Sequence, residues 1–256
     1  MLRRAAILLL FTAAAMTASG ADDPNQQCIG TLGVADVDVN NLASLQKGAR
    51  NFVNYCLGCH SLGFMRWNRV AEDLHLSEEQ LEQSLIFTGS KVHDYIKSPM
   101  PRGDATDWFG RAPPDLTLIT RSKGPDYVFR YLKGFYRDDS PARPTGVNNL
   151  IFDGASMPAV LADLQGVQAL VTHAIIDPKT GKTKQKVCDK IVLEQPGRMS
   201  PAEFDVFVHD TVNFLTYIGE PVRAERQSMG VVVVLFLAVF TVFAYLLKKE
   251  YWKDVH

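Results

Sequence analysis

Apolar residues recur at helical spacing along much of the chain, and few stretches alternate as a strand would. The first such stretch predicts a helix over residues 41–55, capped by Asn40 or Asn41. Its apolar face would consist of Leu42, Leu45, Ala49, Phe52 and Val53. This helix leads directly into the chain's most informative motif.

Three further helices are marked by their first residues. Ser77–Gln80 forms a capping box and predicts a short helix that begins there. Gly124-Pro125 predicts a helix that runs to Gly134, with proline in its first turn. Ser200–Glu203 combines a capping box with a proline at the first helical position, and predicts a longer helix ending at Gly219 or Pro221.

The segments between these helices are rich in proline and glycine. We expect residues 98–114 and 138–165 to be irregular, and residues 177–197 to form an exposed, lysine-rich hairpin around Thr180-Gly181. Long loops inside a compact domain are usually functional. The fold class predicted is mainly α, with long loops.

A continuous apolar run near the C-terminus predicts a transmembrane helix over residues 228–248. Met229–Leu247 carries no charge and would span about 28 Å at ~1.5 Å per residue, against a hydrocarbon core of ~30 Å. A buried soluble helix is the alternative, but the run is apolar on every face. Lysines follow at once, so residues 249–256 are expected to be a cytoplasmic tail.

The N-terminus has the pattern of a secretory signal peptide, predicted over residues 1–21. Arg3 and Arg4 precede the apolar run Ala5–Phe11, and small residues follow. An uncleaved membrane anchor is the alternative, although the run is short for a span. Both ends then agree on a bacterial inner-membrane protein with one span, whose domain at residues 22–227 lies in the periplasm.

Charge narrows the class of partner. The segment Ala21–Gln227 has 26 acidic and 22 basic residues, a formal net charge of −4. This excess disfavours nucleic acid and permits a basic protein partner.

Cys56-Leu57-Gly58-Cys59-His60 is the Cys-x-x-Cys-His pattern of covalent c-type haem attachment. Each thiol adds to one vinyl group of the porphyrin, and the histidine binds the iron. A thioredoxin-like pair or half of a zinc site would also use two cysteines at this spacing. A thioredoxin-like pair has no use for the histidine. A zinc ribbon would need a second Cys-x-x-Cys pair, which the two remaining cysteines do not form.

Cys28 and Cys188 are those remaining thiols. An even pair in an oxidising compartment favours a disulfide, and two free thiols are the alternative.

The second axial position of the iron decides between electron transfer and chemistry at an open site. Met157-Pro158 in a long loop is the first candidate, because proline stiffens the backbone beside the ligand. Met100-Pro101 has the same dipeptide and is the second candidate. One of His93, His173 and His209 could bind instead, or the site could stay open.

Four landmarks in this order resemble the cytochrome c1 family, the haem subunits of the cytochrome bc1 complex, and the C-terminal span is a fifth. They are the haem motif, Arg111–Leu116 with Arg121, Gly124–Phe129 with Gly134–Tyr136, and Met157-Pro158. The likeness covers residues 42–256. Here Ala159 follows Met157-Pro158, where the family often has more prolines, and the lysine-rich segment with Cys188 is unlike the family core.

The resemblance implies one haem c with His60 and Met157 as axial ligands, Arg121 beside a haem propionate, and Pro113 and Pro114 against the haem edge. It implies an electron-transfer subunit rather than a catalyst alone, with cytochrome b, the Rieske iron–sulfur protein and a soluble cytochrome c as partners in a dimeric complex. The alternatives are a haem enzyme or gas sensor with an open sixth site, or a tethered carrier serving an oxidase.

Overall fold

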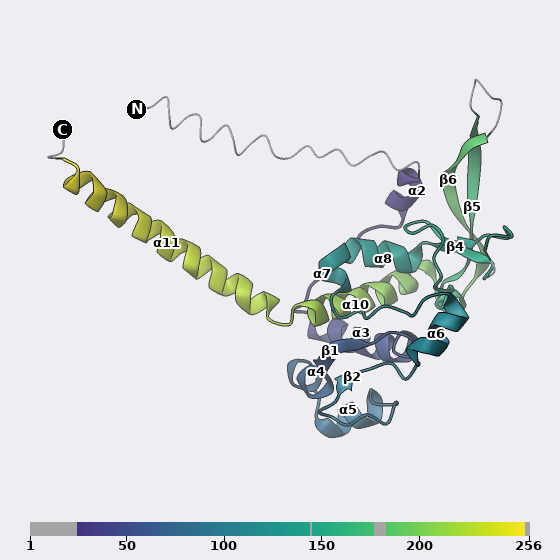
Figure 1. Cartoon of the computed structure of the whole chain (residues 1–256), viewed down its shortest axis with the longest axis horizontal. Helices are drawn as coiled ribbons and strands as arrows, with labels where there is room; N and C mark the ends of the chain where they lie inside the picture. The colour runs from purple at the N-terminus through teal and green to yellow at the C-terminus, as the bar shows by residue number, and fades with distance from the viewer. Residues whose placement is uncertain (1–24, 144, 177–182, 254–256) are drawn as a thin grey trace.

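The computed structural model describes residues 25–143, 145–176 and 183–253. Figure 1 shows a helical domain, a long hairpin that projects from it, and one extended helix that leaves it. The predicted signal peptide lies outside the described residues, as do the turn at Thr180-Gly181 and the last three residues of the predicted tail.

Two crossing helices, α3 (Leu42–Tyr55) and α10 (Pro201–Gly219), form the centre of the domain. Their apolar faces are buried, with Phe52 and Val208 at 0 % exposure. A β-carbon added at Gly48 would lie 2.0 Å from the Asp210 carbonyl oxygen and 2.6 Å from Phe214 Cβ. The helix backbones therefore approach so closely that only glycine fits at the crossing.

Buried polar side chains pair across the same contact. The Ser44 hydroxyl donates to Asp210 Oδ1 (2.5 Å), and Asn51 Nδ2 donates to the Phe207 carbonyl (3.2 Å). Asn213 Nδ2 donates to Ser44 Oγ (3.1 Å). Unpaired polar groups would be costly here, so these bonds specify one register for the two helices.

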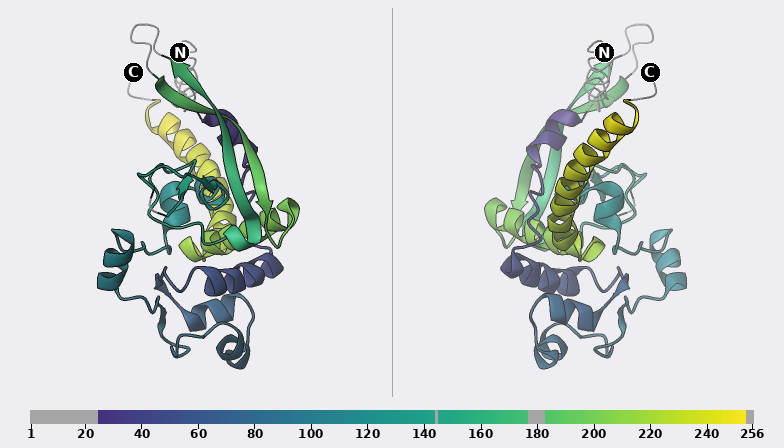
Figure 2. Two further views of the ribbon diagram at one scale, coloured as in Figure 1. Left: turned by 90° about the vertical axis from the view of Figure 1, so that its right-hand side faces the viewer. Right: turned by 90° about the vertical axis from the view of Figure 1, so that its left-hand side faces the viewer.

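The remaining elements pack beside this pair or project from it, as the β5–β6 hairpin and α2 do (Figures 1 and 2). The helices are α2 (Gln26–Thr31), α4 (Trp67–Asp73), α5 (Glu78–Ser84), α6 (Arg102–Phe109), α7 (Ile119–Lys123), α8 (Pro125–Lys133) and α9 (Ala162–Gln165). The strands form three antiparallel pairs: β1 (Leu62–Arg66) with β2 (Tyr95–Ile96), β3 (Phe135–Arg137) with β4 (Val147–Asn149), and β5 (Gly166–Ile176) with β6 (Thr183–Pro196).

The capping signals in the sequence are confirmed. Asn41 Oδ1 accepts from the Ser44 amide (3.1 Å) at the start of α3. Both reciprocal bonds of the capping box are present at Ser77 and again at Ser200. The helix that Gly124-Pro125 predicted is α8, which ends at Lys133.

Three expectations need correction. Residues 138–165 are not wholly irregular, since they contain β4 and α9. Residues 98–114 are not wholly irregular, because α6 lies between Pro101, its N-cap, and Gly110, which adopts φ = 74° at its end. The proline and glycine thus bound a helix there instead of excluding one.

The hairpin is also far longer than predicted, with strands of 11 and 14 residues. Register shifts after Val167, Val171 and Ile175 break the alternation by which a strand is recognised in sequence. The structure joins Cys28 to Cys188 by a disulfide with Cα atoms 6.0 Å apart. This bond links α2 to β6, and the two half-cystines share a small apolar cluster with Leu32 and Leu150.

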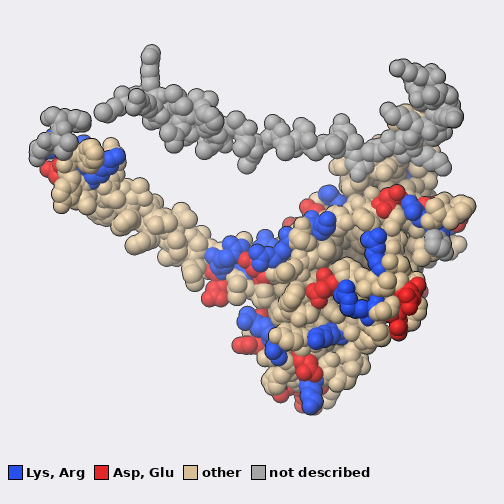
Figure 3. All heavy atoms as spheres, in the orientation of Figure 1, with Lys and Arg blue, Asp and Glu red and all other residues tan. Residues whose placement is uncertain are grey.

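Helix α11 (Arg223–Tyr251) contains the predicted span and continues beyond it at both ends. Glu225–Tyr251 is long and apolar enough to cross a membrane, and none of its apolar window is buried against the domain. Figure 3 shows the charged side chains gathered at the two ends of this helix, with an uncharged surface between them. That distribution fits a membrane anchor.

Gly48→Ala should destabilise the domain by about 3 kcal/mol, because the added methyl group meets backbone atoms that cannot move aside. Gly103→Ala in α6 is the matched control, since a β-carbon there meets nothing within 4 Å. Urea unfolding of both variants measures the difference. Equal stabilities would contradict the close helix contact.

Candidate haem-binding site

Helix α3 ends directly before the haem motif, and the motif itself forms a tight turn. The Cys56 amide donates to the Phe52 carbonyl (2.8 Å), which ends the helical ladder. The amides of Cys59 and His60 both donate back to the Cys56 carbonyl, at 3.0 and 2.8 Å. The turn brings both thiols and the imidazole to one end of α3, and within the described residues neither thiol forms a disulfide.

The orientation of His60 is fixed by a carbonyl. His60 Nδ1 lies 2.8 Å from the Pro114 oxygen. A carbonyl oxygen only accepts, so Nδ1 carries the proton and Nε2 keeps its lone pair for a metal. Burial lowers the pKa of His60, partly opposed by this bond and by the charge of Asp115. The neutral imidazole that binds iron is thus the favoured form.

Burial also acts on the two thiols. It raises the pKa of Cys56 to about 12, with a further contribution from Cys59, and it raises the pKa of Cys59. Before the haem is attached, both groups are therefore held as protonated thiols.

Asp115 holds the segment that carries Pro114. Its Oδ2 accepts from the Gly63 amide (2.6 Å), and its Oδ1 accepts from both the amide and the hydroxyl of Thr117 (2.8 and 2.5 Å). The Leu116 amide donates to the Ser61 carbonyl (2.9 Å). Pro114 is therefore held against β1, and with it the acceptor for His60.

A hollow opens beside the motif. It is lined by Cys59, Ser61, Gly63, Lys97, Ser98, Met100, Arg102, Ala105, Ala112, Pro113 and Asp115. Two free thiols at the required spacing and an imidazole with its Nδ1 proton engaged are the donor set for covalent haem attachment. The residues present fit a c-type haem.

Only some of the predicted haem ligands and haem neighbours line this hollow. Met100 and Pro113 line it, and Pro114 acts through its carbonyl oxygen rather than through its ring. Met157 is half-buried and lies instead in a second pocket, beside Leu132, Phe135 and Leu161.

The remaining candidate residues lie outside both pockets. Arg121 is exposed on α7, and its charge contributes to the lowered pKa of Glu220. His173 Nδ1 lies 2.6 Å from Asp189 on the hairpin, and His209 Nε2 lies 3.0 Å from the Asp36 carbonyl. His93 is exposed in the turn before β2.

The helical domain, the haem motif and the apolar α11 together define a membrane-tethered c-type cytochrome. The chain belongs to the cytochrome c1 family, whose model matches residues 37–174 and 182–255. Proteins of this family carry one covalently attached c-type haem.

Individual relatives agree over most of the chain. Cytochrome c1 of Allochromatium vinosum is 47 % identical over 98 % of both proteins. The ammonia monooxygenase gamma subunit of Nitrosomonas europaea is 43 % identical over 87 % of this chain and 88 % of its own length. Mitochondrial cytochrome c1 of Saccharomyces cerevisiae is 26 % identical over 83 % of this chain and 67 % of its own.

Sequence reasoning did not assign a role to Asp115 or to the Pro114 carbonyl. Asp115 falls inside the segment that carried the family resemblance, which was the available signal. Its function depends on Gly63, 52 residues away, where an added β-carbon would lie 2.8 Å from the Asp115 carboxylate.

Asp115→Ala should lower stability by about 2 kcal/mol, because it removes three hydrogen bonds to a carboxylate that is partly exposed to solvent. It should also loosen the Pro114 acceptor and broaden the Soret band. Asp107→Ala, an exposed carboxylate on α6, is the control. Thermal unfolding and absorption spectra of the haem-loaded variants measure both effects; an Asp115 variant that matches the control in both would contradict the role.

Proposed function

We propose that this protein is the haem subunit of a bacterial cytochrome bc1 complex, which receives one electron from the Rieske iron–sulfur protein and passes it to a soluble cytochrome c. The observation that carries the proposal is the Cys56–His60 motif, with the His60 ring oriented by the Pro114 carbonyl, on a domain tethered by α11. No bond of a substrate is made or broken in this role.

The bound haem supplies a one-electron couple, and the chain's own residues hold and orient it. Cys56 and Cys59 tether it, and His60 provides one axial ligand. Met157 provides the other in this proposal, which rests on the family resemblance. A soft, neutral thioether favours ferrous iron and raises the potential. The exposed Arg121 guanidinium suits a propionate.

Membership of the family supports cytochrome b and the Rieske protein as neighbours, and we extend this to a dimeric complex. We further propose that residues 1–21 are a signal peptide, that the domain of residues 22–227 lies in the periplasm, and that the tail after α11 is cytoplasmic. Lys248 and Lys249 in the last turns of α11 support this orientation.

Met157→Leu should lower the midpoint potential by on the order of 0.2 V, a fraction of the ~0.8 V that axial ligands cover, and should let ferrous haem bind carbon monoxide. Met100→Leu is the matched control, because Met100 lines the hollow beside Cys59. Redox titration and a carbon monoxide difference spectrum decide. If only the Met100 variant shifts, Met100 is the ligand; carbon monoxide binding by the unaltered protein would favour the haem enzyme or sensor.

Cytochrome b and the Rieske protein should co-purify with the chain after mild detergent extraction. This experiment separates the bc1 subunit from a tethered carrier that serves an oxidase. Recovery with an ammonia monooxygenase instead, the assembly named for the Nitrosomonas relative, would overturn the assignment.

Reporter fusions test the orientation. Alkaline phosphatase joined after residue 227 should be active, since it folds outside the cytoplasm. The same enzyme joined after residue 256 should be inactive, and a fluorescent protein at that position should fluoresce. The reverse pattern would refute the proposed topology.

A further inference from the structure

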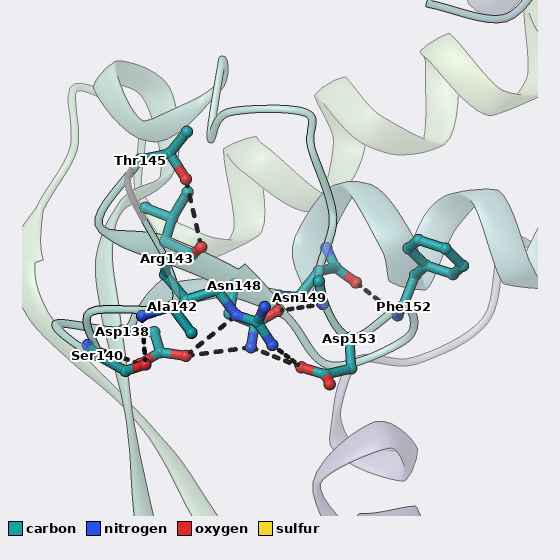
Figure 4. Close-up of polar contacts among 11 residues, drawn as sticks. Asp138, Ser140, Ala142, Arg143, Thr145, Asn148, Asn149, Phe152 and Asp153 are labelled. Carbon is teal, nitrogen blue, oxygen red and sulfur yellow. Dashed lines mark hydrogen bonds and ion pairs between the residues drawn. The ribbon is translucent and has the colours of Figure 1, made fainter. Parts of the chain in front are cut away.

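A polar cluster centred on the buried Asn148 (Figure 4) lies in the segment that precedes Met157 in the sequence. We call Asp138, Arg143, Asn148, Asp153 and Gly154 the Asn148 cluster. Asn148 lies in β4 and is only 3 % exposed. A buried side-chain amide needs partners for two donors and two acceptors.

Asn148 has all four partners. Its Nδ2 donates to Asp138 Oδ2 (3.1 Å) and to Asp153 Oδ1 (2.8 Å). Its Oδ1 accepts from the amides of Asn149 (2.8 Å) and Gly154 (3.0 Å). One side chain thereby joins the start and the end of the loop.

Arg143 offsets part of the charge of the two carboxylates. Its Nη2 lies 2.6 Å from Asp153 Oδ1, and its Nε lies 3.6 Å from Asp138 Oδ2, too far for a hydrogen bond. The hydrogen bond from Asn148 and then the charge of Arg143 lower the pKa of Asp153. The Asp153 carboxylate therefore stays ionised and accepts from both Asn148 and Arg143.

The neighbouring Asn149 anchors the cluster to α8. It is 2 % exposed, and its Nδ2 donates to the Tyr131 carbonyl (2.8 Å). Its Oδ1 accepts from the amide of Ile151 (2.9 Å), which fixes the chain between Asn149 and the cluster residue Asp153. The loop is thus attached to the helix that also contributes Leu132 to the Met157 pocket.

Met157 stands between this anchor and a second one. Gly154, held by Asn148, precedes it by three residues and adopts φ = 75°, which disfavours any other residue. On the other side, Leu161 and Leu164 are buried at 5 % and 2 % exposure. Only residues 155–160 separate the two anchors, and Pro158 stiffens them further.

We propose that Asn148 is a positioning residue for Met157: by closing the loop at Gly154, it holds the thioether where it can stay bound to iron. This inference rests on the proposed role of Met157 as axial ligand. An aspartate at position 148 would face two carboxylates, and a leucine would leave buried donors and acceptors unpaired. Only an amide of this length satisfies the cluster.

Asn148→Leu in the haem-loaded, detergent-extracted protein is the first test. With the loop loosened, imidazole should compete with Met157 for ferric iron about tenfold better, which corresponds to roughly one of the four hydrogen bonds of Asn148 acting on the bound thioether. The midpoint potential should fall. Titration by the Soret shift, well below the unfolding temperature, separates this effect from simple loss of stability.

Asp153→Ala is the second variant, should Asn148→Leu fail to fold. The Asp153 side chain is 81 % exposed, so its removal is tolerable, yet it takes one acceptor from Asn148. Imidazole affinity should rise about threefold. Asp139→Ala is the matched control: it removes the same charge from the same loop, but Asp139 pairs with Arg137 (3.2 Å) and not with Asn148.

Met157→Leu, measured in parallel, separates the two proposals. If it opens the iron to imidazole and the Asn148 and Asp153 variants follow in part while Asp139→Ala does not, the inference holds. If Met157→Leu opens the iron and the cluster variants bind imidazole like the unaltered protein, the positioning role is refuted and the ligand stands. If Met157→Leu changes nothing, the ligand assignment fails and the inference fails with it.

Discussion

The contact of α3 with α10 at Gly48 is the constraint on which the rest of the domain depends. The backbone of α10 lies where a β-carbon of residue 48 would be, and the bonds of Ser44 and Asn51 fix the register of the crossing. Because α3 ends one residue before Cys56, that register also fixes where the haem motif leaves the helix. Packing and function are thus set by one helix pair.

Local signals predicted the parts of the structure that local chemistry determines. Asn41, Ser77 and Ser200 begin helices because each side chain bonds an amide three residues away, which needs no tertiary partner. The haem motif is likewise local, since all its groups lie within five residues. The apolar length of α11 is a property of composition alone, so its existence was predictable.

The structural features that the sequence did not predict depend on contacts between residues far apart in the chain. The bulges of the β5–β6 hairpin hide its alternation, and its pairing is visible only in the fold. Asp115 acts on Gly63, and Asn148 acts on Asp138 and Gly154. The local sequence does not separate an asparagine or aspartate that makes such long-range bonds from one that only faces solvent. Met100 and Met157 are also equivalent in local sequence, and only their surroundings differ.

The two sides of the haem site are therefore built by different means. On the His60 side, a carbonyl fixed by Asp115 orients the ring, and covalent attachment one and four residues earlier keeps it in place. On the other side, the ligand proposed is Met157, in a loop with no covalent link to the haem, and its retention would depend on how firmly that loop is closed. A thioether is a weak ligand, and a free loop would surrender it to water or small molecules. The hydrogen bonds of Asn148 would close the loop beside that proposed ligand, whereas those of Ser44 and Asn51 fix the register of a helix crossing that is already closely packed.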